Sequence, residues 1–395
     1  MINFAPSSVS LMRFRCTSAI RSCLPCGKIV LLTLGALSIP FCVVMGNRRK
    51  GRKYFARVES GKRMKLWLLV WAGVVFVSGA AWGDKHLPDK WRAPLPVRNA
   101  EPLNTLFLQA PPASASVLPD NEVQIQLSLD VVNHLLFDKA GDNRYEQDFE
   151  IQRLTATYVR GIGSGMEIAV HIPLLARNGG FLDEVINTWH RWFGFKGGGR
   201  ASHRNYQVHE WIARGGRTLV LLDTPAIGMG DVVVEGRKWL GQSGRSFWAV
   251  RAMLKLPAGN AAQQFGSGAV DAGLGVICTY QSNSRLVWHG NLSVVWVGSP
   301  TRLDAPARNM VQWMLAAEYL FDARTSFVLQ VDDNHTPVVV GVPYADGARR
   351  SLTVGLVREI RPGLCAEISL TENQFGWLAR IAPDFHLHLG VRWCR

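Results

Sequence analysis

The chain has 395 residues, 44 Lys and Arg, 30 Asp and Glu, and a formal net charge of +14. The excess charge lies at the start, because residues 1–63 contain 12 basic residues and one acid, whereas residues 84–395 contain 31 bases and 29 acids. A nearly neutral body is not typical of nucleic-acid binding, so we expect no nucleic-acid partner. A hydrophobic content of 48% excludes a disordered chain.

The first 83 residues contain two apolar segments. Residues 64–83 are laid out as a secretory signal peptide, with a basic start at Lys65, an apolar stretch and small residues before Asp84. On this interpretation residues 1–63 are a basic leader that lies upstream of the true start codon. The alternative makes both apolar segments membrane helices that flank a basic cytoplasmic loop. Both interpretations place the body outside the cytoplasm.

The next segment, residues 84–120, is rich in Pro and Ala and shows no alternation of apolar and polar residues. We expect it either to remain in the periplasm or to enter a barrel as a plug.

From residue 121 onward, apolar and polar residues alternate repeatedly with period two, which is the pattern of strands with one apolar face. Each segment is long enough to cross a membrane as a tilted strand. The pattern predicts twelve strands, at 121–137, 146–160, 166–176, 231–241, 245–256, 269–282, 285–298, 309–321, 325–334, 349–360, 363–373 and 384–393.

The links between these strands alternate in length. Every even-to-odd link is short, and every odd-to-even link is longer, up to residues 177–230. Outer-membrane barrels sort their connections in this way, with short periplasmic turns and long extracellular loops. We therefore predict an all-β fold over residues 121–395, an antiparallel transmembrane barrel of about twelve strands. A soluble lipocalin-like barrel is the structural rival.

Aromatic residues give a second indication of the barrel. Seven of them share the apolar parity of their strands and lie near predicted periplasmic turns or the C-terminus, as expected for an interfacial girdle. They are Tyr158, Trp248, Tyr280, Trp288, Tyr319, Phe321 and Trp393. Trp296 and Trp313 would mark the opposite interface.

Short motifs in the body resemble one family. They include Pro94-Leu-Pro-Val-Arg98-Asn99, the segment from Trp189 to Arg200, Gly228-Met-Gly230-Asp231 and the stretch Pro383–Gly390. Together they resemble the proteobacterial family labelled domain of unknown function 3187, over roughly residues 94–393. This resemblance implies an outer-membrane barrel and carries no established activity. The final Cys394-Arg395 departs from the aromatic C-terminal residue that is usual in such barrels.

Polar residues on the inward face are the candidates for contact with a solute. The lumen-lining candidates are Arg251, Lys255, Glu318, Glu367, His386 and His388. Their mixed signs leave two interpretations open: a self-satisfied network of ion pairs in a narrow lumen, or a polar conduit.

The long loop carries the remaining candidates. Residues 181–193 follow helical spacing with an aromatic face, so they predict a short amphipathic helix. This helix could lie in the outer-leaflet interface, fold inward as a plug or gate, or cap the barrel mouth. Trp189, His190 and Arg200 are the loop candidates, and residues 206–223 predict a hairpin above the rim.

The function that fits these features is passage or binding of a small solute, hydrophobic ones included, by an outer-membrane barrel. The alternatives are an outer-membrane enzyme acting on lipid and a structural or surface-interaction barrel with a plugged lumen. Because no catalytic motif is present, we expect no enzymatic activity, no cofactor and no metal. The expected partners are outer-membrane lipid, the outer-membrane assembly machinery and a small solute.

Overall fold

The computed structural model describes residues 91–92, 94–194, 203–335, 337–343, 345–372 and 383–395. The predicted leader and signal peptide, and Arg200 of the long loop, lie outside the described residues. Within the described ranges, no helix has both the length and the apolar character needed to cross a membrane.

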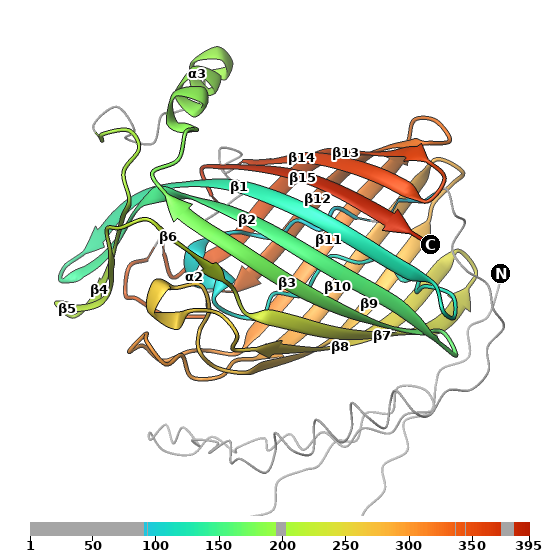
Figure 1. Ribbon diagram of the computed structural model, residues 1–395, viewed down its shortest axis with the longest axis horizontal. Coiled ribbons are helices and arrows are strands. Elements are labelled where there is room, and N and C mark those ends of the chain that lie inside the picture. The colour runs from blue at the N-terminus through green and yellow to red at the C-terminus, as the bar shows by residue number, and fades with distance from the viewer. Residues whose placement is uncertain (1–90, 93, 195–202, 336, 344, 373–382) are drawn as a thin grey trace, which may run out of the picture. The chain divides into compact units, whose positions relative to one another are not determined.

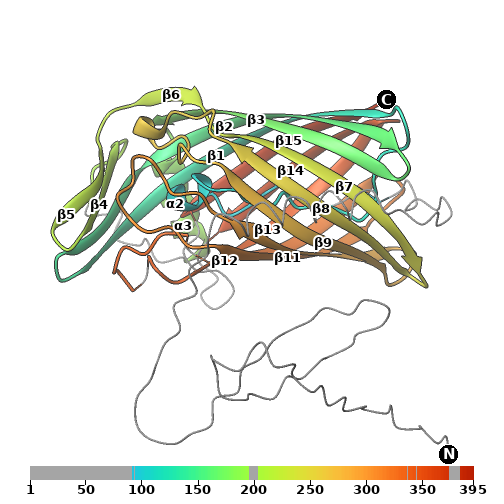
Figure 2. The same cartoon turned by 90° about the horizontal axis from the view of Figure 1, so that it is seen from below.

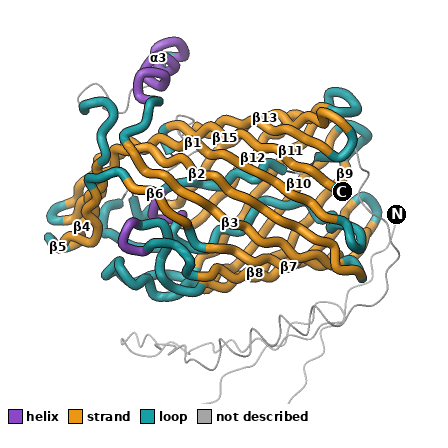
Figure 3. The backbone as a smooth tube through the Cα atoms, in the orientation of Figure 1, coloured by secondary structure: helices purple, strands orange, loops and turns teal. Residues whose placement is uncertain are grey.

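Twelve antiparallel strands form a closed barrel (Figure 1, Figure 3). Each strand pairs with its neighbours along the barrel, and β1 closes the cylinder by pairing with β15, where Ile125 lies opposite Trp393. The predicted strand count is confirmed, and the strand ends differ from the predicted ones by at most three residues. The strands are β1 (Val123–Ala140), β2 (Asn143–Gly163), β3 (Met166–Asn178), β7 (Val232–Ser243), β8 (Ser246–Leu256), β9 (Asp271–Gln281), β10 (Leu286–Trp296), β11 (Met310–Leu320), β12 (Thr325–His335), β13 (Ala348–Arg361), β14 (Leu364–Glu372) and β15 (Phe385–Cys394).

The two faces of the wall follow strand parity. On β1, Ile125 and Leu127 are exposed on the outside, whereas Gln126 and Ser128 between them are buried in the lumen. All seven aromatic residues of the predicted periplasmic girdle are exposed on the outer face. A hydrocarbon environment makes this apolar exterior favourable, and the polar interior remains free to form hydrogen bonds.

The short turns lie at the end of the barrel that holds the C-terminus, and this end is called periplasmic here (Figure 1). In the β11–β12 turn, the Arg324 backbone N–H donates to Asp322 Oδ1 at 2.7 Å and keeps the pKa of this carboxyl below its usual value. One link differs from expectation: β1 and β2 are joined by a two-residue turn at residues 141–142. The predicted loop 138–145 is instead a hairpin that extends beyond the barrel, because β4 pairs with its β2 edge.

The other extracellular elements come from the long β3–β7 connection. The predicted hairpin is confirmed as β4 (His209–Arg214) and β5 (Arg217–Leu222). The predicted helix is α3 (Asp183–Phe193), and the short β6 (Ala226–Met229) pairs with the upper part of β3. A 3-10 turn, η3 (Ala261–Gln263), lies in the β8–β9 connection.

Residues 94–120 run through the inside of the barrel and are called the luminal segment here. They contain one short helix, α2 (Pro102–Thr105), which lies within the barrel in both views (Figure 1, Figure 2). Leu95, Leu108 and Ala115 along this segment are fully buried. The core of the molecule is therefore formed by the inner wall together with this segment.

Candidate functional site

Polar side chains of the inner wall hold the backbone of the luminal segment. An irregular chain forms no regular backbone hydrogen bonds within itself, so at membrane depth its N–H and C=O groups need other partners. The side chains of the inner wall supply these partners. The backbone N–H groups of Leu108, Ala113 and Ala115 donate to Asp271, Asn291 and Thr279, each at 2.9 Å. The carbonyls of Val97 and Leu108 accept from Gln330 and Gln312 at 2.9 and 2.8 Å.

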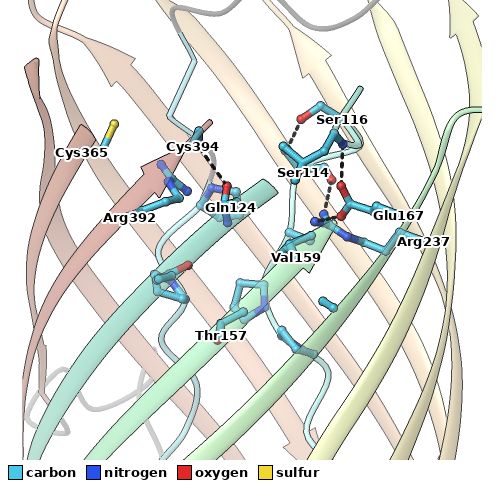
Figure 4. A pocket seen from close by; sticks show the side chains of 18 of the residues that line it. Ser114, Ser116, Gln124, Thr157, Val159, Glu167, Arg237, Cys365, Arg392 and Cys394 are labelled. Atoms are coloured by element: carbon cyan, nitrogen blue, oxygen red, sulfur yellow. Dashed lines mark hydrogen bonds and ion pairs between the residues drawn. The ribbon is translucent and has the colours of Figure 1, made fainter. Parts of the chain in front are cut away.

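A cavity of about 590 Å³ lies in the periplasmic half of the lumen. The luminal segment forms one side of it, and residues of β1, β2, β3, β7, β13, β14 and β15 form the rest. Figure 4 shows Glu167 and Arg237 of this wall facing Ser114 and Ser116 of the segment. Glu167 pairs with Arg237 and accepts from the Leu118 backbone N–H at 2.6 Å. At this part of the cavity lining, the negative charge of Glu167 is therefore balanced by Arg237.

Arg98 lies where the internal spaces meet. It lines the large cavity and also three smaller spaces of about 20, 20 and 30 Å³ deeper in the lumen. Its Nη1 donates to the Gln109 carbonyl at 2.6 Å, which ties together two limbs of the luminal segment. The guanidinium therefore stands between the large cavity and the narrow remainder of the lumen.

The extracellular end of the lumen is filled by an apolar cluster. Leu103, Leu106 and Phe107 at and after α2 pack against buried side chains from the extracellular loops and the β4–β5 hairpin, including Val338 and Ile212. Apolar side chains packed in this way exclude water from the extracellular mouth.

The charged lumen-lining candidates all lie inside the barrel and are engaged with other protein groups. Arg251 contacts Glu235 at 3.4 Å and Asn291 at 2.5 Å, and it also donates to the Pro111 carbonyl. Lys255 pairs with Asp231 and lies 3.4 Å from Asp271. These two bases fasten the luminal segment and the β8–β9 loop.

The two histidine candidates share one carboxylate. His386 Nε2 and His388 Nδ1 lie 2.9 and 2.8 Å from Asp130 Oδ1. His388 also lies 3.4 Å from Glu367, and Glu367 in turn accepts from Gln126 at 2.8 Å. Asp130 lines the large cavity, whereas His386 lines only one of the small spaces.

Glu318 belongs to a buried chain of three groups. Thr279 Oγ1, His289 and Glu318 are linked at 3.1 and 3.1 Å, which resembles the nucleophile–base–acid order of hydrolases. All three side chains are fully buried, however, and the Thr279 hydroxyl accepts the Ala115 backbone N–H while Glu318 accepts that of Arg92. In this structure the chain of groups holds the luminal segment.

The two loop candidates that the structure describes, Trp189 and His190, do not enter the lumen. Trp189 is half-buried and His190 is buried on α3, with His190 Nε2 3.8 Å from Glu372 Oε1. Glu372 lies on the outward face of β14, so α3 is associated with the outside of the barrel wall.

The structure also adds candidate residues that were not chosen from the sequence. Asn291, Gln312 and Thr279 bind the luminal segment, and Arg98 lines both the large cavity and the smaller spaces. Strand parity already placed the first three inward, and selecting uncharged as well as charged inward residues would have found them. In the described part of the chain, no group of three His, Cys, Asp or Glu residues is arranged to hold a metal ion.

The model of the family described as "Protein of unknown function (DUF3187)" matches residues 79–394. No curated protein sequence matches the chain.

Solved structures with a similar fold are outer-membrane channels and porins. The COG4313 outer membrane channel from Pseudomonas putida F1 is 11% identical, with a TM-score of 0.50, and the match covers 73% of this chain and all of that one. The NanC porin is 10% identical with a TM-score of 0.38, covering 69% and 98% of the two chains. The Ralstonia pickettii toluene transporter TbuX is 9% identical with a TM-score of 0.33, covering 70% and 90%.

Proposed function

The chain belongs to the DUF3187 family, and we propose that it forms a narrow outer-membrane channel for a small solute. The observation that carries this proposal is the 590 Å³ cavity between the luminal segment and the inner wall. This volume lies within the range of about 300–1,000 Å³ that is usual for small-molecule sites.

The lining of the route favours a small solute with an apolar part and a polar part. Five prolines and Val117 face the cavity together with paired charges such as Glu167 and Arg237. At the extracellular mouth the solute would meet the apolar cluster around Phe107. Apolar constrictions resist water and ions more than they resist apolar molecules, so this order of surfaces favours a hydrophobic or amphipathic solute. The COG4313 channel supports the fold of this proposal and not its specificity.

The proposal is tested with the refolded mature protein in planar bilayers and in liposomes. We expect a small conductance, and a several-fold larger one when residues 94–118 are deleted, because the polar wall groups would then line an open lumen. A gel shift between boiled and unboiled samples verifies that the deletion variant still forms a barrel. Absence of both conductance and solute uptake in the native protein would overturn the channel.

A second candidate function is a structural or surface-interaction barrel with a plugged lumen. The apolar cluster at the mouth favours it, because sixteen buried residues close this end of the barrel. The same experiment separates the two functions: a plugged barrel has no flux in the native protein, and it gains flux only after deletion of the segment.

Export through a cleaved signal peptide at residues 64–83 is part of the proposal, as is insertion by the outer-membrane assembly machinery. A hydrophobic outward face requires delivery to a membrane, and the layout of the segment fits a Sec-type leader. N-terminal sequencing of the mature protein should give a start at or near Asp84. An intact leader would instead support the anchored alternative.

A further inference from the structure

Helix α3 lies outside the barrel wall, at the extracellular end, and its start contacts the wall (Figure 1). Leu182, immediately before the helix, and Ile186 within it are buried against Val131 of β1 and Phe385 of β15. These wall residues share the parity of Leu127 and Leu389, which are exposed on the outside. Half-buried Leu129, Leu370 and Leu387 extend the same contact.

Polar groups on the same outer face fix the start of this helix. Glu150, at an outward position of β2, accepts the backbone N–H groups of Phe181 and Leu182 at 3.0 and 2.6 Å. Asp183 accepts from Asn133 at 3.1 Å and from the Tyr206 backbone N–H at 2.7 Å. A buried carboxylate is costly unless it is hydrogen-bonded, so these contacts hold the α3 segment against the wall.

The helix lies at the level of the outer-leaflet interface. On β15, Phe385 beneath the helix is eight residues from Trp393 of the periplasmic girdle. On β10, Trp296 is also eight residues from the girdle residue Trp288. Eight strand residues span roughly 27 Å along the strand and about 21 Å along the barrel axis after a tilt of about 40°, compared with an apolar band of about 25 Å. The contact of α3 with the wall therefore lies near the extracellular edge of the apolar band.

A second apolar stripe of the segment is directed away from the wall. Phe181, Val185 and Trp192 recur at spacings of four and seven residues and are 60%, 52% and 77% exposed. Glu184 and Arg191, also exposed, flank this stripe. A soluble surface rarely carries three large apolar groups in one row, and here the row continues the lipid-facing band of the barrel.

We propose that α3 is an interfacial helix whose Phe181–Val185–Trp192 stripe inserts among the acyl chains of the outer leaflet. Continuity with the exposed band formed by Leu127 and Leu389 selects lipid as the occupant. An interfacial helix of this type buries its apolar face roughly 5–10 Å into the boundary between headgroups and acyl chains. The proposal is independent of whether the lumen conducts a solute.

The test uses the mature protein in phosphatidylcholine–phosphatidylglycerol vesicles, in a background where Cys278, Cys365 and Cys394 are replaced by Ala. A bimane label is placed by Val185→Cys or, as a matched control on the neighbouring position, by Glu184→Cys. Spin labels on the lipid acyl chains report contact with the membrane interior, and iodide reports contact with water. Heat modifiability on gels confirms that each labelled protein is a barrel.

We expect acyl-chain quenching at position 185 to exceed that at position 184 by about twofold or more, with the opposite order for iodide. Equal iodide quenching at both positions without acyl-chain quenching would overturn the proposal. Cross-linking of the Val185→Cys variant to a second copy would also overturn it, because the stripe would then be a protein interface.

Discussion

At the scale of single residues, Arg98 is the side chain whose position bears most directly on passage through the lumen. It lines the large cavity and the smaller spaces beyond it, and it bridges two limbs of the luminal segment through Gln109. Its role could not be derived from strand periodicity, because it precedes the first strand.

We expect Arg98→Ala to increase solute uptake by proteoliposomes several-fold, because loss of the guanidinium joins the separated spaces. Arg245→Ala, at an exposed periplasmic turn where Arg245 donates to the Ser282 carbonyl, is the matched control and should leave uptake unchanged. Swelling rates with a graded series of small solutes measure the effect. Equal rates for wild type and Arg98→Ala would place the constriction elsewhere.

Asn291 offers a second prediction at this scale. Its amide accepts the Ala113 N–H at 2.9 Å and donates to the Ala113 carbonyl at 2.8 Å, so one side chain replaces a strand partner. Asn291→Leu keeps the volume and leaves both backbone groups without this partner. We expect the free energy of unfolding to fall by roughly 2–4 kcal/mol, measured by urea titration of the refolded barrel. Gln242→Leu, at the exposed end of β7, should change it little.

At the scale of elements, the association of α3 with the wall depends on one carboxylate and one glycine. Glu150 accepts two N–H groups of the segment, and Gly180 has a φ of +70° with its absent Cβ position 1.8 Å from Glu150 Cδ. A side chain there would displace the carboxylate from the helix start, so both positions are required for the same contact.

We therefore expect Glu150→Ala to weaken the attachment of α3 by about 2 kcal/mol, whereas Glu150→Gln keeps an acceptor and should weaken it less. Gly180→Ala should act in the same direction as Glu150→Ala. Limited proteolysis within residues 179–194 of the native protein provides the measurement, with the heat-dependent gel shift as the check on the barrel. Protease resistance equal to wild type in Glu150→Ala would show that the apolar contact suffices.

The luminal segment is the other element whose place follows from its partners. Its prolines and alanines lack a ladder pattern, so it cannot join the sheet, and its backbone groups find Asp271, Gln312 and Asn291 instead. From the sequence, the charged inward residues could have lined a polar conduit. In the structure, most of the lumen-lining candidates instead form hydrogen bonds with the luminal segment or ion pairs with one another.

At the scale of the whole molecule, the closed cylinder explains how residues far apart in the chain come together. Pairing of β1 with β15 brings Asp130 beside His386 and His388, more than 250 positions away. A barrel has no free edge, so its stability depends on this last pairing as much as on any hairpin.

The sequence alone determined the strand number, the parity of each strand and the end at which each loop lies. It could do so because lipid on one side and a polar lumen on the other impose a period of two along every strand, which is a local property. The predicted helix and the β4–β5 hairpin were local in the same sense.

Only the tertiary structure decided what the inward residues touch and on which side of the wall α3 lies. Residues 84–120 fitted the periplasm or the lumen equally well by composition, and the helix fitted the lumen, the mouth or the outer leaflet. The positions of the luminal segment and of α3 depend on long-range hydrogen bonds, such as that from Ala113 to Asn291 and that from Leu182 to Glu150. Such bonds do not produce a repeating pattern in the sequence. The physical reason is that periodicity records which medium a face meets, whereas a buried polar group is satisfied by any partner that closure of the barrel brings within reach.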